Sequence, residues 1–299
     1  TTATASSTSS SAPATKTTVE SNSRIVASHK ELTIQDAHSA VLKGKYKKEV
    51  LTYAGKKNEG EFKLGYNPAV EDVKLVRAVV TSKTGAPQEI TEKEINVMDA
   101  GWNASAKRYT GSKVLVASLP GVDVGSTIEV EYEITTKNKP YIAGFEAFQL
   151  FDDLDQKEFQ LTAPANVKVQ TVNTGPAGIV TRSTSDVSGS HVYQWQSQKV
   201  PALPAEGQLP PEWSYLAGVD YFAGDMEAYL TELNTTLMDR AKQSAKAGET
   251  AKKLVADAKG KKAGVKAIRD FVAKNIRHGG PSFTELPLSE LSAADTTLR

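Results

Sequence analysis

Apolar and polar residues alternate through much of the chain between about residue 45 and residue 200. The alternation is strictest over residues 127–135, where the apolar positions are Ile128, Val130, Tyr132 and Ile134 and the positions between them are Glu129, Glu131 and Glu133. A period of two buries one face of a strand and leaves the other in water, as in antiparallel sheets. We therefore expect the four apolar side chains to face the core.

The same period recurs in shorter segments that are separated by turns. The apolar positions of these segments include Phe62, Leu64 and Tyr66, then Val114 and Val116, then Val167 and Val169, and finally His191, Tyr193 and Trp195. Turn sequences rich in Gly, Pro and Asn lie between them, at residues 67–68, 84–87, 120–125 and 173–176. Many short strands with no helices between them predict a sandwich or a barrel. Of the two we expect a large antiparallel β-sandwich, which we place at residues 25–200.

The pattern changes after four prolines within residues 201–211, which exclude a helix or a central strand and predict a linker over residues 201–222. Residues 223–299 are then expected to be helical. The first apolar stripe comprises Met226, Tyr229, Leu230, Leu233 and Leu237, and a later one, from about Ala263, comprises Val265, Ile268, Phe271, Val272 and Ile276. Between them Thr250 is the expected N-cap of a helix that carries Leu254 and Val255. The sequence thus predicts a mainly β protein with a C-terminal α part.

The first 24 residues contain 14 Ser or Thr and are expected to form a flexible tether. The missing initiator Met and the tether together favour an exported protein, in the periplasm, on the cell surface or secreted, whose leader has been removed. A chain that starts within a longer protein is the alternative. No apolar run approaches the roughly 18 residues needed to span a bilayer.

Hydrophobic residues make up 39% of the chain, so it can bury a real core. Lys and Arg number 36 against 35 Asp and Glu, which argues against a uniformly nucleic-acid-binding protein. Residues 240–277 nevertheless hold twelve Lys or Arg and three Asp or Glu. Solvated helix faces are favoured over a nucleic-acid or acidic-lipid footprint because aromatic side chains do not interleave with the lysines. We expect no nucleic-acid partner.

Catalytic and metal-binding patterns are absent from the sequence. There is no cysteine, which removes disulfides, thiolate zinc sites and a cysteine nucleophile. The candidates that remain are four histidines (His29, His38, His191 and His278), an acidic cluster (Asp152, Asp153 and Asp155) and two glycosylation sequons (Asn103 to Ser105 and Asn234 to Thr236). The histidines lack metal-ligand spacing, and the acidic cluster lacks the glycine and distal glutamate of the twelve-residue calcium loop. We therefore assign no catalytic, cofactor-binding or metal-binding residue.

The order of the predicted strands resembles a bacterial family. The matching segments are residues 61–66 followed by Asn67-Pro68, residues 73–80 with a turn at Gly85, residues 114–119 running into Pro120-Gly121, the strand 128–134, and Tyr193-x-Trp195 leading into Pro201. Together they resemble the large β-sandwich domain of unknown function that precedes a transglutaminase-like domain in exported proteins. The chain departs from that pattern at Asp155-Gln156, where the family has a Pro-hydrophobic pair.

The C-terminal part extends the resemblance, which covers residues 45–299. Residues 267–277 are similar to the helix that opens a transglutaminase-like α+β domain, and residues 293–299 are similar to the lead-in to its Gly-Asp-Cys nucleophile. The resemblance implies that residues 223–299 are an incomplete start of that domain. It also implies a parent protein that is a papain-like Cys-His-Asp hydrolase or acyltransferase. No position matches this triad, so the chain alone is expected not to be an enzyme.

Three functions stay open at this level. The chain is the non-catalytic N-terminal part of an exported transglutaminase-like protein, or a cell-surface or periplasmic binding or adhesion module with no enzymatic parent, or a sandwich enzyme that uses carboxylates, such as a glycoside hydrolase. In the first case the resemblance implies two partners: the remaining transglutaminase-like domain, in the same or a cleaved chain, and a protein or peptide substrate that the sandwich positions. The separation of about 5–10 Å that catalytic carboxylates require cannot be read from a sequence.

Overall fold

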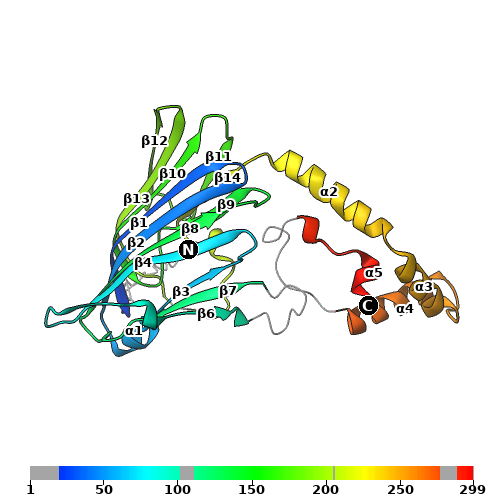
Figure 1. Cartoon of the computed structure of the whole chain (residues 1–299), viewed down its shortest axis with the longest axis horizontal. Helices are drawn as coiled ribbons and strands as arrows, with labels where there is room; N and C mark the ends of the chain where they lie inside the picture. Colours follow the sequence, from blue (N-terminus) through cyan, green and yellow to red (C-terminus); the bar gives the residue numbers. More distant parts are fainter. Residues whose placement is uncertain (1–19, 102–110, 205, 277–287, 299) are drawn as a thin grey trace, which may run out of the picture.

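The computed structural model describes residues 20–101, 111–204, 206–276 and 288–298. Its main element is an eight-stranded sheet in the order β12-β13-β10-β1-β2-β8-β4-β5. The bounds are β1 Ser23–Asp36, β2 Ser39–Val50, β4 Glu71–Thr81, β5 Pro87–Glu89, β8 Thr127–Thr136, β10 Asp153–Pro164, β12 Thr181–Val187 and β13 Ser190–Val200. Two three-stranded sheets lie over one face of this large sheet (Figure 1).

The first small sheet has the order β3-β7-β6, and the second has the order β11-β14-β9. Their bounds are β3 Glu61–Tyr66, β6 Ile95–Asp99, β7 Lys113–Ser118, β9 Ile142–Ala147, β11 Val169–Thr174 and β14 Gly218–Ala223. The helices are α1 Tyr53–Asn58, α2 Met226–Lys242, α3 Ala245–Val255, α4 Lys261–Asn275 and α5 Ala294–Thr297, with short 3-10 turns at Glu92–Glu94, Glu212–Ser214 and Leu288–Glu290. Helices α2 to α5 extend to one side of the sandwich (Figure 1).

Each small sheet closes its own apolar cluster against the large sheet. Beneath β3-β7-β6 the fully or nearly fully buried side chains include Phe62, Leu115, Ala117, Ile128 and Val130. Beneath β11-β14-β9 they include Phe148, Phe159, Leu161, Trp195 and Val219. The rings of Phe159 and Trp195 stack with their centroids 5.6 Å apart. Within the described residues, no second sheet covers the opposite face of the large sheet, and that face is mainly polar.

The predicted sandwich with a C-terminal helical part is confirmed, and the strand at residues 127–135 behaves as its alternation indicated. Ile128 and Val130 are fully buried, Tyr132 is partly buried and packs against the core, and Ile134 is partly buried. One pairing differs from the expected antiparallel arrangement, since β1 and β10 run parallel. The chain passes from β8 through β9 in a small sheet before β10 enters the large sheet beside β1. Such a crossover permits parallel pairing, which hairpins do not.

Two expected boundaries differ from the structure. The segment 201–222 contains most of β14, whose residues Val219 and Ala223 are fully buried in the sandwich. The prolines end β13 as expected, but they do not prevent a strand seven residues later. At the other end, the expected tether 1–24 overlaps the fold, because Ser21 and Ser23 are buried and β1 begins at Ser23.

The start of the second helix is also a correction. α3 begins at Ala245, so Thr250 lies inside the helix and is not its N-cap. Ala and Lys at residues 245–247 are strong helix formers, and they extend the helix past the point where a capping residue alone would place its start. Helix α4 spans residues 261–275, close to its predicted position.

We predict that Ile128→Asp unfolds the sandwich whereas Glu129→Ile does not. Ile128 is 0% exposed, and an unpaired carboxylate at that position loses the burial energy of the side chain, about 1.5–3 kcal/mol, and adds a desolvation cost. Glu129 lies on the polar face, where its ion pair with Lys47 at 2.9 Å contributes under about 1 kcal/mol. Urea unfolding measures both, and equal midpoints for the two variants would contradict this assignment of faces.

Candidate functional site

The exposed face of the large sheet carries a polar groove. One cavity of about 600 Å³ lies over β1, β2, β8 and β10, and a second of about 290 Å³ adjoins it. The two cavities share His29, Lys45 and Glu131 in their linings. We call these two cavities together the sheet groove.

Columns of opposite charge form the floor of the sheet groove. Along β2 the outward positions are Lys43, Lys45 and Lys47, and the residues directly opposite them on β8 are Glu133, Glu131 and Glu129. Of these facing residues, Lys47 and Glu129 form an ion pair at 2.9 Å. Among the described residues, Lys45 and Glu131 have no ion-pair partner within 4.0 Å. The groove therefore presents free cations beside free carboxylates, which suits a polar ligand that carries both charges.

His29 lies between two carboxylates in this groove. Its Nε2 is 2.7 Å from Glu31 Oε1, and its Nδ1 is 3.6 Å from Glu158 Oε2. The hydrogen bond from His29 holds the pKa of Glu31 below its ordinary value. In the described residues no hydroxyl nucleophile hydrogen-bonds to His29, so the arrangement lacks the nucleophile–base contact that acyl transfer requires.

The other histidines make local contacts in separate places. His38 Nδ1 lies 2.8 Å from the carbonyl oxygen of Lys139 near the turn between β1 and β2. His191 Nδ1 lies 2.5 Å from Asp186 Oδ1 on the β12–β13 hairpin. His278 and the sequon at Asn103 lie outside the described residues. The second sequon, at Asn234, lies within α2.

The acidic cluster does not converge on a common point. Asp152 pairs with Lys48 at 3.2 Å, Asp153 accepts a hydrogen bond from the backbone N–H of Ala202, and Asp155 lies 3.7 Å from Arg24. No group of three potential metal-ligating side chains occurs among the described residues. The carboxylates instead bind three different segments to the start of β10.

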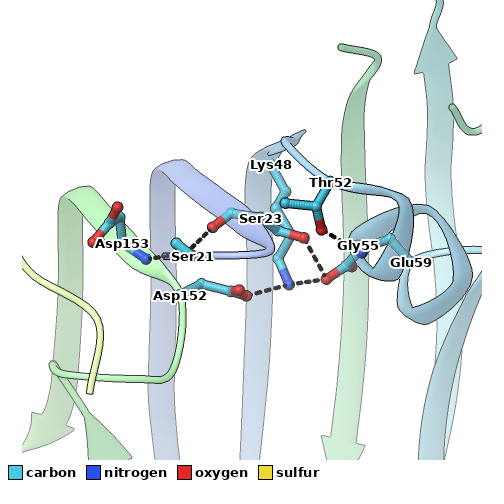
Figure 2. Close-up of polar contacts among 8 residues, drawn as sticks. All are labelled: Ser21, Ser23, Lys48, Thr52, Gly55, Glu59, Asp152 and Asp153. Carbon is cyan, nitrogen blue, oxygen red and sulfur yellow. Dashed lines mark hydrogen bonds and ion pairs between the residues drawn. The ribbon is translucent and has the colours of Figure 1, made fainter. Parts of the chain in front are cut away.

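Asp152 belongs to a polar network at one end of the large sheet (Figure 2). Lys48 Nζ lies between Asp152 and Glu59, at 3.2 and 2.7 Å, and Ser23 Oγ donates to the same Glu59 at 3.3 Å. Burial would lower the pKa of Lys48, but the two carboxylates outweigh burial and raise it. Beside this network the Gly55 N–H donates to Thr52 Oγ1 at 3.1 Å, and a Cβ on Gly55 would lie 2.2 Å from the backbone oxygen of Asn22.

A serine and a lysine that share a carboxylate resemble a nucleophile with its base, but burial argues against a reaction here. Ser23 is only 1% exposed, so a substrate cannot reach its hydroxyl. The network joins the first residues of β1, the end of β2, helix α1 and the start of β10 (Figure 2). Its role in this arrangement is structural.

A second charged cluster lies inside the sandwich, between the large sheet and the β11-β14-β9 sheet. Glu146 of β9 faces Lys157 of β10 at 2.5 Å and Lys30 of β1 at 2.9 Å. Burial alone would raise the pKa of Glu146, yet the two ammonium groups hold it below its ordinary value. Burial also lowers the pKa of Lys157, and Glu146 offsets only part of that effect. The period of two places Lys157 on the same face as Phe159 and Leu161, but it does not show which carboxylate Lys157 meets there.

We predict that Glu146→Gln destabilises the sandwich strongly. The substitution leaves two buried ammonium groups without a carboxylate, and breaking a buried pair in this way costs about 3–5 kcal/mol. Urea unfolding at neutral pH measures the loss. The matched control is Glu129→Gln, which breaks an exposed pair and costs under about 1 kcal/mol. A Glu146→Gln midpoint equal to that of the control would contradict the prediction.

The same cluster predicts a pH dependence. Because the pKa of Glu146 is lower in the folded than in the unfolded protein, its contribution is fully present above the unfolded pKa and is lost as pH falls through the folded value. We expect the unfolding free energy of the wild type to fall more between pH about 6 and pH about 3 than that of Glu146→Gln. Parallel pH profiles of the two proteins would rule out this linkage.

Comparison with known proteins shows which family the chain belongs to and which solved structures share its fold. A solved structure of a Parabacteroides distasonis ATCC 8503 protein, provisionally described as a protease, matches 93% of this chain with a TM-score of 0.81 and 18% sequence identity. At that identity the likeness shows the fold alone. The chain spans 55% of the length of that protein.

A zinc metallopeptidase of the M1 class from Deinococcus radiodurans matches 68% of this chain and 42% of its own, at 10% identity, but its TM-score of 0.36 is too low to bear on the fold. None of the curated proteins compared with the sequence matches it. The profile of a domain of unknown function with solved structure, DUF3857, matches residues 36–204, which is more than half of the chain. The chain therefore belongs to the DUF3857 family.

Proposed function

We propose that this chain is the non-catalytic N-terminal part of a longer, exported transglutaminase-like protein, in which the sandwich positions a protein or peptide substrate. Two findings support the proposal. The chain matches a solved protein nearly twice its length that is provisionally described as a protease. Among the described residues, it also joins a sandwich to helices whose apolar faces stay exposed.

The uncovered helix faces carry the proposal. On α4 the side chains of Val265, Ile268 and Val272 are 61%, 37% and 47% exposed. On α2 the side chains of Leu230 and Met238 are 52% and 55% exposed. Apolar residues at helical spacing usually face a protein core. Short helices are only marginally stable in water unless such a face is packed. In the proposal, the remainder of the transglutaminase-like domain covers them, in the same chain or as a cleaved partner.

The start of α2 is the part of the helical segment that is fixed to the sandwich. Tyr229 is 8% exposed and packs edge-on against Tyr141, with the ring centroids 4.8 Å apart. Tyr141 in turn contacts Phe222 of β14 at 5.0 Å. These aromatic contacts support a role for the sandwich in setting where a following domain sits.

The sheet groove supplies the surface for a substrate in this proposal. A polypeptide carries both ammonium and carboxylate groups, and the free Lys45 and Glu131 on the groove floor complement both. The cysteine, histidine and aspartate of the reaction would come from the remainder of the protein, because this chain has no cysteine. Export rests on the Ser/Thr-rich first 24 residues, and no described helix is long and apolar enough to cross a membrane.

Hydrogen exchange in α4 tests the proposal. We compare the 299-residue chain with a chain extended through the following ~150 residues, about one domain. The amides of residues 261–275 should exchange at least about tenfold more slowly in the extended chain, since added packing raises the local unfolding free energy. The matched control is β10, whose exchange should not change. Equal exchange of α4 in both proteins would show that the following residues add no packing to this helix. That result would favour the binding-module alternative.

Activity gives a second prediction. Purified 1–299 should incorporate no amine into an acceptor protein above a buffer blank, because it contains no thiolate to form an acyl-enzyme. The extended chain should show turnover, and removal of its cysteine nucleophile should abolish it. Turnover by 1–299 itself would overturn the assignment as a non-catalytic part.

A further inference from the structure

The two edge strands of the large sheet, β5 and β12, differ. β5 has three residues and begins with Pro87, which has no N–H to donate to a further strand. β12 has seven residues, and each of them is exposed. β12 contains no proline and no lysine, and its pairing with β13 shows no bulge. Natural edge strands usually carry such devices to prevent further pairing, and of these β12 has only the charged side chains of Arg182 and Asp186. Among the described residues no strand pairs with its outer edge.

The hairpin turn determines which backbone groups of β12 are free. Ser188 and Gly189 both have positive φ, at 50° and 80°, which makes a two-residue type I′ turn between β12 and β13. The pair that flanks such a turn, Val187 and Ser190, is hydrogen-bonded, and hydrogen-bonded pairs then alternate along the ladder. The residues between them therefore direct their N–H and C=O groups to the open edge. These residues are Arg182, Thr184 and Asp186.

We propose that β12 pairs antiparallel with β12 of a second copy of this chain, around a two-fold axis at Thr184. In this register Thr184 faces its own equivalent, and Arg182 faces Asp186 of the other copy on both sides of the axis. Each of the three outward residues then forms a hydrogen-bonded pair, roughly six hydrogen bonds in all. Shifting the register by two residues loses a pair and both charge contacts.

The side chains of β12 favour this occupant. Arg182 lies over the rings of Tyr193 and Trp195, with its Cζ 5.7 Å from each centroid, and Asp186 contacts His191. Both side chains are thereby held on the same face of the sheet. Opposite charges directly across an antiparallel pair stabilise it, and Thr–Thr pairs do so as well. On the other face the facing residues are Ser183 with Ser185 and Thr181 with Val187, which are small and uncharged.

Within one chain Arg182 and Asp186 cannot pair with each other. They are four residues apart on one strand, which separates them by about 13 Å. A charge contact between them exists only across two copies, and this makes the contact testable by exchange of the charges. The proposal concerns the free edge of the sandwich and is independent of what covers the helices.

The first test is sedimentation equilibrium of the full 299-residue chain across the micromolar range. We expect a reversible, weak dimer, as one strand pair buries little surface. Thr184→Pro removes an outward N–H without removing a bond to β13, and it should raise the dimer dissociation constant at least about tenfold. Thr184→Val keeps the N–H and should dimerise like the wild type. Thermal unfolding confirms that each variant is folded.

The second test exchanges the charges. Arg182→Asp and Asp186→Arg should each weaken the dimer about three- to tenfold, because each places like charges across the axis. The double variant Arg182→Asp, Asp186→Arg restores opposite pairs and should recover dimerisation. In the dimer the amides of Arg182, Thr184 and Asp186 should gain protection from hydrogen exchange.

Three results would overturn the proposal. One is a monomer throughout the concentration series. Another is a dimer that Thr184→Pro leaves unchanged, which would place the contact elsewhere, for example on the exposed faces of α2 and α4. The third is a monomer whose β12 amides gain protection from hydrogen exchange when reduced, carboxymethylated α-lactalbumin, an unfolded polypeptide, is added. That result would assign the edge to an extended polypeptide instead of a second copy.

Discussion

The core and the sheet groove both depend on one constraint, namely that the central strands of the large sheet each have one dry and one wet face. Along β8 the dry face holds Ile128 and Val130, which are fully buried, and the wet face holds three glutamates. β2 obeys the same alternation, so its lysines align opposite those glutamates. A shift of one residue would exchange the two faces, which fixes the register strongly. The core and the sheet groove are thus two consequences of one pattern.

The buried charge cluster is the exception to this pattern. Lys157 and Lys30 lie on the dry face of the large sheet, and both contact Glu146 of the small sheet. Replacing such a buried cluster by apolar side chains often costs a fold little, so the cluster is weak evidence for added stability. It does require that β9 sit at one position over β1 and β10. The cluster therefore helps to fix how the second small sheet, and with it β14 and the start of α2, lies on the large sheet.

The helical part differs from the sandwich in how much of its apolar surface is buried. The sandwich buries its own apolar faces between three sheets, so its interior needs no further element. The helices bury Tyr229 at their first turn and leave Val265 and Val272 about half exposed. A surface of that kind marks a place where more protein is expected to pack. The sheet groove and the open β12 edge, in contrast, belong to the sandwich.

The sequence by itself determined the features that depend on neighbours along the chain. The alternation along residues 127–135 predicted the buried faces, the helical period predicted α2 and α4, and the resemblance identified the kind of domain. The sequence did not show where α3 begins. The helix propensity of Ala245 and Lys246 outweighed the preference of Thr250 for an N-cap position. Nor did it reveal β14 within the proline-rich segment, where Val219 is buried by strands far away in sequence.

Only the tertiary structure decided which distant residues meet. His29, Lys45, Glu131 and Glu158 come from four strands, and their convergence in one groove depends on the strand order β10-β1-β2-β8. The parallel pairing of β1 with β10 and the contact of Glu146 with Lys157 depend on it in the same way. The period of apolar residues along a strand shows which of its faces is buried and which is exposed. The order of the strands in the sheet, in contrast, depends on the packing of all strands together. For that reason the faces were predictable from the sequence and the site was not.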